Sequence, residues 1–184
     1  MLSKKETSHI QNKLHLTSDH RYHNNGLNVN FCLQGGSQRE PLENFISNVF
    51  YKYYQSNITD FYPQLLSIST QKTQLCAVAG LRNGEKEQFF SENYLHIPLS
   101  DSIKENFSID YERKYIVEVG NLAPAHIGQM RWLITALTAF LYGAGYKVVI
   151  FTAIQSVTNA FKRMGLDLIT LNEAKHDDLS EKLK

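Results

Sequence analysis

The sequence predicts a mixed α/β (α+β) fold in which helices flank a twisted, mixed sheet. Its first half contains two short strand-like runs separated by a polar turn, which is typical of an antiparallel hairpin. Its second half alternates strand, helix, strand, helix and strand, an order that favours parallel pairing. The 184 residues, of which 42% are hydrophobic and 20% charged, are enough for one domain with a real core.

The N-terminal part of the chain is polar, and residues 1–37 predict a flexible arm ahead of a folded domain at 38–174. Within the arm, the alternating segment 27–33 is a candidate edge strand. Residues 40–55 predict a helix, because apolar residues recur every three or four positions and Pro41 suits the first turn.

The next segments predict a hairpin followed by short helices. Strands are expected at 64–69 and 75–81, with the polar stretch between them as the turn. Aromatic and aliphatic residues at 89–97 predict a short helix and loop. Asp101 is expected to cap a second short helix that runs to Phe107.

The second half opens with a predicted strand at 114–119. A helix at 127–142 is apolar nearly all round, so it is expected to be well buried, and Gly143 and the residues after it supply its C-cap. The continuous apolar run at 148–152 fits a central strand of the sheet.

The last part of the domain is predicted to be a helix and a strand. Ser156 is expected to cap a helix at 157–164, and 166–171 is expected to be the final strand. Residues 175–184 form a predicted charged C-terminal tail.

Bulk properties exclude several classes of function. A net charge of +1 gives no electrostatic reason to expect nucleic acid as a partner. The two cysteines do not make a disulfide framework, and Cys76, in an apolar run, is expected to be a buried thiol. The start of the chain lacks the apolar segment of a secretory signal, and the longest apolar stretch, 132–142, is shorter than the roughly 20 residues that span a bilayer. The cytoplasm is therefore the expected compartment, with no integral membrane segment.

The segment 115–123 (YIVEVGNLA) is the most informative part of the sequence. It begins like a buried strand and then places a carboxylate, Glu118, among apolar residues. A buried carboxylate must be paired or must act as a base, because an unpaired buried charge is very costly. As a base with a raised pKa, it would deprotonate an amine that attacks a thioester. A structural ion pair with Arg39 or Arg82 is the alternative, and it stays open at this point.

The loop after this strand leads into the N-terminus of the helix at 127–142, where backbone N–H groups and the helix dipole favour anions. Asn121 is a candidate either for binding a substrate amide or for capping the strand. His126 is a candidate base or phosphate contact, with an exposed loop histidine as the alternative. Arg131 can reach a phosphate or an acidic partner, or it is an ordinary surface arginine.

The order of these elements resembles the GNAT-type acyltransferase fold. In that fold, the strand before the long helix parts from its neighbour, and the following loop and helix N-terminus receive the phosphates of an acyl carrier. Gly128 matches the glycine of the GNAT phosphate-loop pattern, while Phe161 stands where those enzymes usually carry a tyrosine. By this resemblance, the residues that bind the donor phosphates are Ile127, Gly128, Gln129 and Arg131.

A closer resemblance, to the thermostable hemolysin family, extends from about residue 37 onward. That family is GNAT-like and is similar to the acyl-homoserine-lactone synthases, which take acyl groups from acyl carrier protein. The resemblance places Glu118 on the strand glutamate of those synthases and Arg39 on their N-terminal arginine near the amine site, with Glu43 beside it. Five blocks carry the resemblance: FYPQLL (61–66), QLCAVAGLR (74–82), VEVGNLA (117–123), RWLITALTAFLYG (131–143) and NAFKRMGL (159–166).

Together, these features predict an N-acyltransferase. It would move a fatty acyl group from an acyl thioester, carried by acyl carrier protein or coenzyme A, to an amino acid or other amine. Acyl-CoA or acyl-phosphopantetheine would be a substrate, and neither a tightly bound cofactor nor a metal is expected. The predicted catalytic residues are Glu118, Asn121 and His126, the amine-binding residues are Arg39 and Glu43, and the acyl pocket is formed by Trp132, Phe151 and Phe161.

Two other functions stay open. The first is a membrane-damaging toxin of the hemolysin type, and the second is a non-catalytic module that binds an acyl carrier on the same fold.

For Trp132, the alternative to a place in the acyl pocket is packing in the core. A homodimer is compatible with the sequence.

Overall fold

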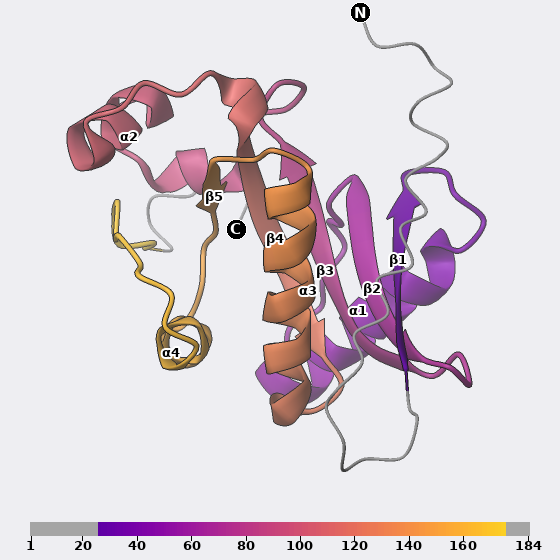
Figure 1. Ribbon diagram of the computed structural model, residues 1–184. Coiled ribbons are helices and arrows are strands. Elements are labelled where there is room, and N and C mark those ends of the chain that lie inside the picture. Colours follow the sequence, from indigo (N-terminus) through magenta and orange to yellow (C-terminus); the bar gives the residue numbers. More distant parts are fainter. Residues whose placement is uncertain (1–25, 176–184) are drawn as a thin grey trace, which may run out of the picture. The chain divides into compact units, whose positions relative to one another are not determined.

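The computed structural model describes residues 26–175 and confirms a mixed α/β fold. Five strands form one sheet in the order β1-β2-β3-β4-β5 (Figure 1). The chain divides into two compact units, Met1–Gly80 with Asn121–Ala136, and Leu81–Gly120 with Leu137–Lys184. The helices and strands are β1 (Leu27–Leu33), α1 (Arg39–Tyr54), β2 (Gln64–Thr70), β3 (Leu75–Asn83), the 3₁₀ helix η1 (Phe90–Tyr94), α2 (Leu99–Phe107), η2 (Arg113–Tyr115), β4 (Ile116–Pro124), η3 (Ile127–Gln129), α3 (Met130–Gly143), β5 (Val148–Ile150) and α4 (Gln155–Arg163).

In the first unit, the predicted edge strand and hairpin are confirmed. β1 pairs with β2 in antiparallel register, from Leu27 opposite Thr70 to Leu33 opposite Gln64. β2 and β3 are neighbours joined by a four-residue turn, which forces them to run antiparallel. The turn is closed by the Thr70 N–H, which donates to the Gln74 carbonyl at 2.9 Å.

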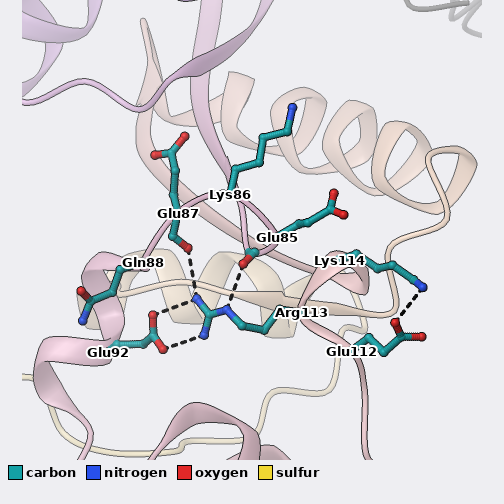
Figure 2. Close-up of a pocket in the computed structure, with 9 residues that line it drawn as sticks. Glu85, Lys86, Glu87, Gln88, Glu92, Glu112, Arg113 and Lys114 are labelled. Atoms are coloured by element: carbon teal, nitrogen blue, oxygen red, sulfur yellow. Dashed lines mark hydrogen bonds and ion pairs between the residues drawn. The ribbon is translucent and has the colours of Figure 1, made fainter. Parts of the chain in front are cut away.

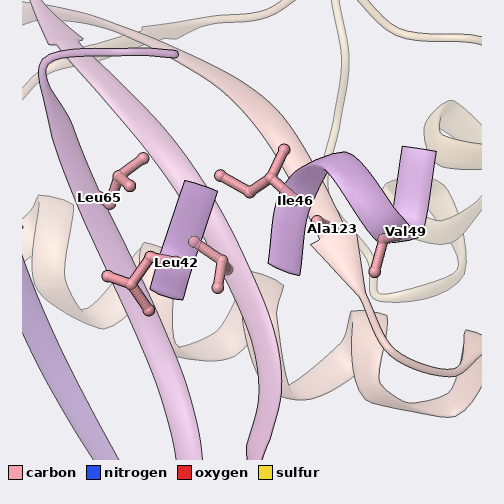
Figure 3. Close-up of a cluster of buried hydrophobic side chains, with 6 residues drawn as sticks. Leu42, Ile46, Val49, Leu65 and Ala123 are labelled. Atoms are coloured by element: carbon pink, nitrogen blue, oxygen red, sulfur yellow. The ribbon is translucent and has the colours of Figure 1, made fainter. Parts of the chain in front are cut away.

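The core of the first unit lies under α1. Apolar residues at helical spacing bury one face of this helix, which ends where Gln55 takes a left-handed conformation with φ 53°. Figure 3 shows the side chains of α1 converging with those of β2 and β4. The buried cluster consists of Leu42, Ile46, Val49, Leu65, Val78 and Ala123.

In the second unit, β4 and β5 run parallel over three residue pairs, from Ile116 opposite Val148 to Glu118 opposite Ile150. β5 ends at this last pair, whereas β4 continues to Pro124. The two strands therefore stop pairing at Glu118. A second core includes residues of both strands and consists of Phe89, Leu99, Ile103, Ile116, Val148 and Ile150.

Several predictions for the C-terminal half were wrong. Segment 166–171 is not a strand, and this leaves β5 at the end of the described sheet instead of at its centre. Val149 on β5 is accordingly 44% exposed. Leu171 instead packs against the second core, so tertiary burial, not pairing, explains its apolar character.

Helix ends and helix burial also differ from expectation. Asp101 and Ser156 do not cap their helices, because each lies inside its helix and the N-cap residues are Pro98 and Ile154. The helix predicted at 127–142 exists as η3 and α3, but it is not buried all round, since Tyr142 is 86% exposed. The aromatic residues of this segment suggested a fully buried helix, but large aromatic side chains often stay partly exposed in folded proteins.

Residues 1–25 of the predicted arm and most of the predicted tail lie outside the described residues. Within residues 26–175, no helix is both long enough and apolar enough to span a membrane.

Candidate functional site

Glu118 is fully buried, with 0% of its surface exposed, and it lies at the point where β4 stops pairing with β5. Its Oε2 accepts the Phe90 N–H at 2.9 Å, and its Oε1 accepts the Ser91 N–H at 2.7 Å. The Arg82 Nη1 lies 3.6 Å from Oε2. Of the two arginines left open by the sequence, Arg82 is therefore the one that pairs with Glu118. Two charge-assisted hydrogen bonds and one cation offset the desolvation of the carboxylate.

A second ion pair holds the backbone that donates to Glu118. Arg113 donates through Nε to the Gly84 carbonyl at 2.9 Å and through Nη2 to the Glu87 carbonyl at 3.1 Å. Its Nη1 and Nη2 contact the two oxygens of Glu92 at 2.8 and 3.1 Å, as Figure 2 shows. Glu92 also accepts a hydrogen bond from the Phe89 N–H at 2.7 Å. Arg113 thus fixes the 84–92 segment on both sides of the turn that binds Glu118.

Sequence reasoning missed Arg113 and Glu92. A signal for Glu92 was available, because a carboxylate three residues into a helix commonly accepts the N–H of the N-cap residue. Here the N-cap residue is Phe89, which lacks the side-chain hydroxyl that Ser or Thr contributes to the usual capping box. Arg113 carried no local signal, because its partners lie 21 to 29 residues away.

The Glu92–Arg113 pair predicts a pH dependence of stability. Burial tends to raise the pKa of Glu92, but hydrogen bonds from Arg113 and Phe89 and the charge of Arg113 outweigh it, so this pKa lies below its ordinary value of 4.5. A lowered pKa contributes stability above the unfolded pKa, and this contribution disappears as the pH falls through the folded pKa. We expect Glu92→Gln to lose about 1–2 kcal/mol of unfolding free energy at neutral pH, and its gap to the wild type to close in acid.

Urea unfolding from neutral pH down to the acid range measures this gap. Glu112→Gln is the matched control, because Glu112 pairs with Lys114 at an exposed position and its side chain is 68% exposed. A gap for Glu92→Gln that stays constant with pH would contradict the assignment.

A cavity of about 650 Å³ lies in the second unit, over β5. This volume falls in the range of small-molecule sites. Ser91 lines the cavity, so one residue both binds Glu118 through its N–H and borders the space. The other lining residues come from η1, α2, β5, α4 and the C-terminal segment: Tyr94, Leu95, Ile103, Phe107, Val148–Ala153, Gln155, Thr158, Lys162 and Asp167–Ala174.

Two contacts shape this cavity. Phe151, which lines it, stacks on Phe161 with ring centroids 4.7 Å apart and an interplanar angle of 14°. Phe161 is itself buried and does not line the cavity. The side-chain amide of Asn172 donates to the Tyr94 carbonyl and ties the C-terminal segment to η1. Of the three residues predicted for the acyl pocket, Phe151 lines the cavity and Phe161 contacts Phe151, and their role in binding an acyl chain stays a prediction.

Trp132, the third residue predicted for the acyl pocket, does not line this cavity. Its side chain is 42% exposed on α3, in the first unit, so the alternative that it packs in the core was wrong.

Asn121 adopts a left-handed conformation, with φ 46°, in the middle of β4. Its Oδ1 accepts the Tyr62 N–H at 3.0 Å, and its Nδ2 lies 3.4 Å from the Asp60 carbonyl that it donates to. Gly80 makes room for this arrangement, since a Cβ there would lie 2.7 Å from the Tyr62 Cβ and 2.8 Å from the Asn121 Oδ1. Asn tolerates positive φ better than most residues. Of its two predicted roles, the contacts of Asn121 match the structural one.

Arg39 is buried at the start of α1, where it is 8% exposed. Its Nε contacts Glu43 at 2.6 Å, and its Nη1 and Nη2 donate to the carbonyls of Pro63 and Tyr62 at 2.8 and 2.6 Å. Nη1 and Nη2 therefore hold α1 to the segment before β2, while Nε pairs with Glu43 inside α1. The predicted amine-binding pair, Arg39 and Glu43, is together in the structure, and its binding role stays a prediction.

The predicted phosphate loop begins with exposed residues. His126 is exposed and Ile127 is 85% exposed, while a Cβ on Gly128 would meet nothing within 4 Å. The His126 N–H donates to the Gln129 side chain at 3.1 Å, and the Gln129 N–H donates to the His126 carbonyl at 2.9 Å. Arg131 follows in α3 and is also exposed. The loop is open to solvent, but two of its backbone donors are used internally.

The candidate residues thus fall in both units. Glu118, Phe151 and Phe161 belong to the second unit, and the other predicted site residues to the first.

Two other kinds of chemistry find no support in the part of the chain that the structure describes. Burial raises the pKa of the Cys76 thiol, which disfavours the thiolate that a nucleophile needs. Within residues 26–175, no group of three His, Cys, Asp or Glu side chains is placed to hold a metal ion.

Comparison with known proteins places the chain in one family. The family model described as Thermostable hemolysin matches residues 33–184. No curated protein matches the chain.

Proposed function

The chain belongs to the thermostable hemolysin family, and from that premise we propose that it is an N-acyltransferase. Its donor would be a fatty acyl thioester of acyl carrier protein or coenzyme A, and its acceptor would be an amino acid or another amine. The observation that carries the proposal is Glu118, a buried carboxylate at the place where two parallel strands stop pairing, bonded to a residue that lines a cavity of about 650 Å³.

The strands support this proposal through their geometry. β4 continues for six residues after its last pair with β5, so its backbone there has no partner on β5. A strand that has lost its neighbour offers N–H groups to a ligand, as a sheet edge does for an extended peptide. The N–H groups near residues 119–122 would hold the thioester carbonyl and stabilise the developing oxyanion.

The proposed reaction needs no metal. The amine nitrogen attacks the thioester carbonyl carbon, a C–N bond forms and the C–S bond breaks. Of the two protons that the substrate ammonium loses, one leaves through Glu118, directly or through a water, and the other passes to solvent after the C–N bond has formed. Phe161 has no acidic proton to give the released thiolate, so the thiolate takes its proton from solvent. Such base assistance typically contributes 10²–10⁴-fold, and positioning contributes the rest.

Mass spectrometry of purified components tests the proposal. The full chain is incubated with acyl carrier protein or coenzyme A loaded with fatty acyl groups of several lengths, together with a mixture of amino acids and simple amines. We expect an acylated amine that is absent without the protein, with release of one free thiol per product. No product with either donor, from protein that is folded by circular dichroism, would contradict the proposal.

A second candidate, membrane damage, is favoured by the family's description. Two exposed aromatic residues on α3, Trp132 and Tyr142, are of the type that enters a membrane interface. Purified protein, free of lipid, is mixed with red blood cells in the presence and absence of donor and amine. Prompt lysis without donor supports a direct toxin, and lysis that requires both substrates points to an acylated product as the lytic agent.

A further inference from the structure

Ser91 has a hydroxyl group that the fold leaves without a partner. The residue is 7% exposed, and its Oγ is buried with no hydrogen-bond partner in the described part of the protein. A buried polar group in this state costs about 1–3 kcal/mol. Native proteins contain few such groups, and each one calls for a reason.

The position of Ser91 supplies that reason. Ser91 lines the 650 Å³ cavity, and its backbone N–H is fixed on Glu118 at 2.7 Å. Ser91 therefore borders both the carboxylate that we propose as the proton acceptor and a ligand-sized space, and a rotation about its Cα–Cβ bond is enough to turn the buried hydroxyl toward that space. Asn93 and Glu92 bind neighbouring backbone groups of the same turn, which keeps this placement rigid.

One part of the cavity suits an alkyl chain. Leu95, Ile103, Val148 and Ile150 line this part, Phe151 adds an aromatic face, and polar residues such as Gln155, Thr158 and Lys162 border the rest. In the apolar part, a hydroxyl can fix one polar atom of a ligand and so decide how the alkyl chain lies.

We propose that the Ser91 hydroxyl donates a hydrogen bond to the carbonyl oxygen of a fatty acyl group bound in this cavity. The identity of the ligand rests on the proposed function. The hydrogen bond places the acyl carbonyl next to Glu118, with the alkyl chain along β5. Ser91 is thus a binding residue. Its hydroxyl destabilises the free protein, and this loss of stability is offset only when the bound ligand supplies a hydrogen-bond partner.

This arrangement predicts opposite effects of one substitution. Ser91→Ala removes a hydroxyl that has no partner in the free protein, so the unfolding temperature should stay the same or rise. The same change should weaken the binding of a dodecanoyl amide roughly 3- to 10-fold, the loss of one hydrogen bond. A dodecyl probe without the carbonyl should bind both forms equally. Ser91→Thr, which keeps a hydroxyl, should retain the preference for the amide.

Calorimetric titration of the full chain with the two probes and a thermal unfolding scan measure these effects. Ser102→Ala is the matched control, because Ser102 is another buried serine of the second unit that does not line the cavity. Equal amide affinity of the wild type and Ser91→Ala, or no amide binding by the wild type, overturns the inference. A clear fall in the unfolding temperature of Ser91→Ala also overturns it. Amide binding that depends on Ser91, without any acyl transfer, supports the inference and removes the proposed enzyme activity.

Discussion

Replacement of Glu118 by Leu is expected to cost about 3–5 kcal/mol of unfolding free energy, the largest loss of any single substitution considered for this chain. The change leaves the N–H groups of Phe90 and Ser91 without their acceptor and leaves the partly buried Arg82 with one carboxylate fewer. Arg82 keeps its contact with Glu87 at 3.3 Å. Urea unfolding followed by circular dichroism measures the loss.

Glu118→Gln separates the structural role from the proposed catalytic one. Its amide oxygen can accept one of the two N–H groups, so a loss of about 1–3 kcal/mol is expected and most of the protein should fold at low temperature. The amide cannot take up a proton, so the acyl-transfer rate per folded molecule should fall about 10²–10⁴-fold. Glu112→Gln is the surface control. Full turnover by folded Glu118→Gln would remove the carboxylate from the mechanism and leave it a purely structural group.

Arg39→Met should give the second-largest effect, a loss of about 3 kcal/mol, because it leaves the carbonyls of Tyr62 and Pro63 without their charged donor. It also removes the partner of Glu43 at the first turn of α1. Since α1 covers the core of the first unit, we expect the whole unit to lose stability. Thermal unfolding measures this effect.

Arg39→Lys and Arg163→Met complete the test of this position. Lysine has one ammonium group and cannot reproduce the planar fork of the guanidinium. Arg39→Lys should therefore lose some unfolding free energy relative to the wild type, but less than Arg39→Met. Arg163 lies exposed at the end of α4, and its replacement should change little. A wild-type unfolding temperature for Arg39→Met would mean that these hydrogen bonds do not hold α1 in place. A raised KM for the amine in folded Arg39→Lys would support the predicted amine-binding role.

Local patterns predicted most of the fold. The helical spacing of apolar residues placed α1 to within one residue at each end, and alternation located β1 within a polar region. The polar turn between β2 and β3 was equally clear. The final strand was the main failure. Leu171 packs on a core far away in the sequence instead of pairing in a strand, and apolar character alone cannot distinguish the two outcomes.

The candidate site was predicted less completely. Glu118 was recognisable as a carboxylate that a buried strand cannot hold without partners. Its partners, the N–H groups of Phe90 and Ser91, lie 28 and 27 residues away and carry no side-chain signal at all. The unsatisfied hydroxyl of Ser91 could not be foreseen either, because serine is common in turns and its hydroxyl usually finds a partner.

By itself, the sequence determined the mixed α/β class, the family and the exceptional character of Glu118, because periodicity, composition and a charge within an apolar run are properties of neighbouring residues. Only the tertiary structure decided which groups satisfy that charge, that β5 ends beside it, and that a cavity borders the same turn. These features depend on contacts between segments distant in the chain, and such contacts form only when the whole core packs.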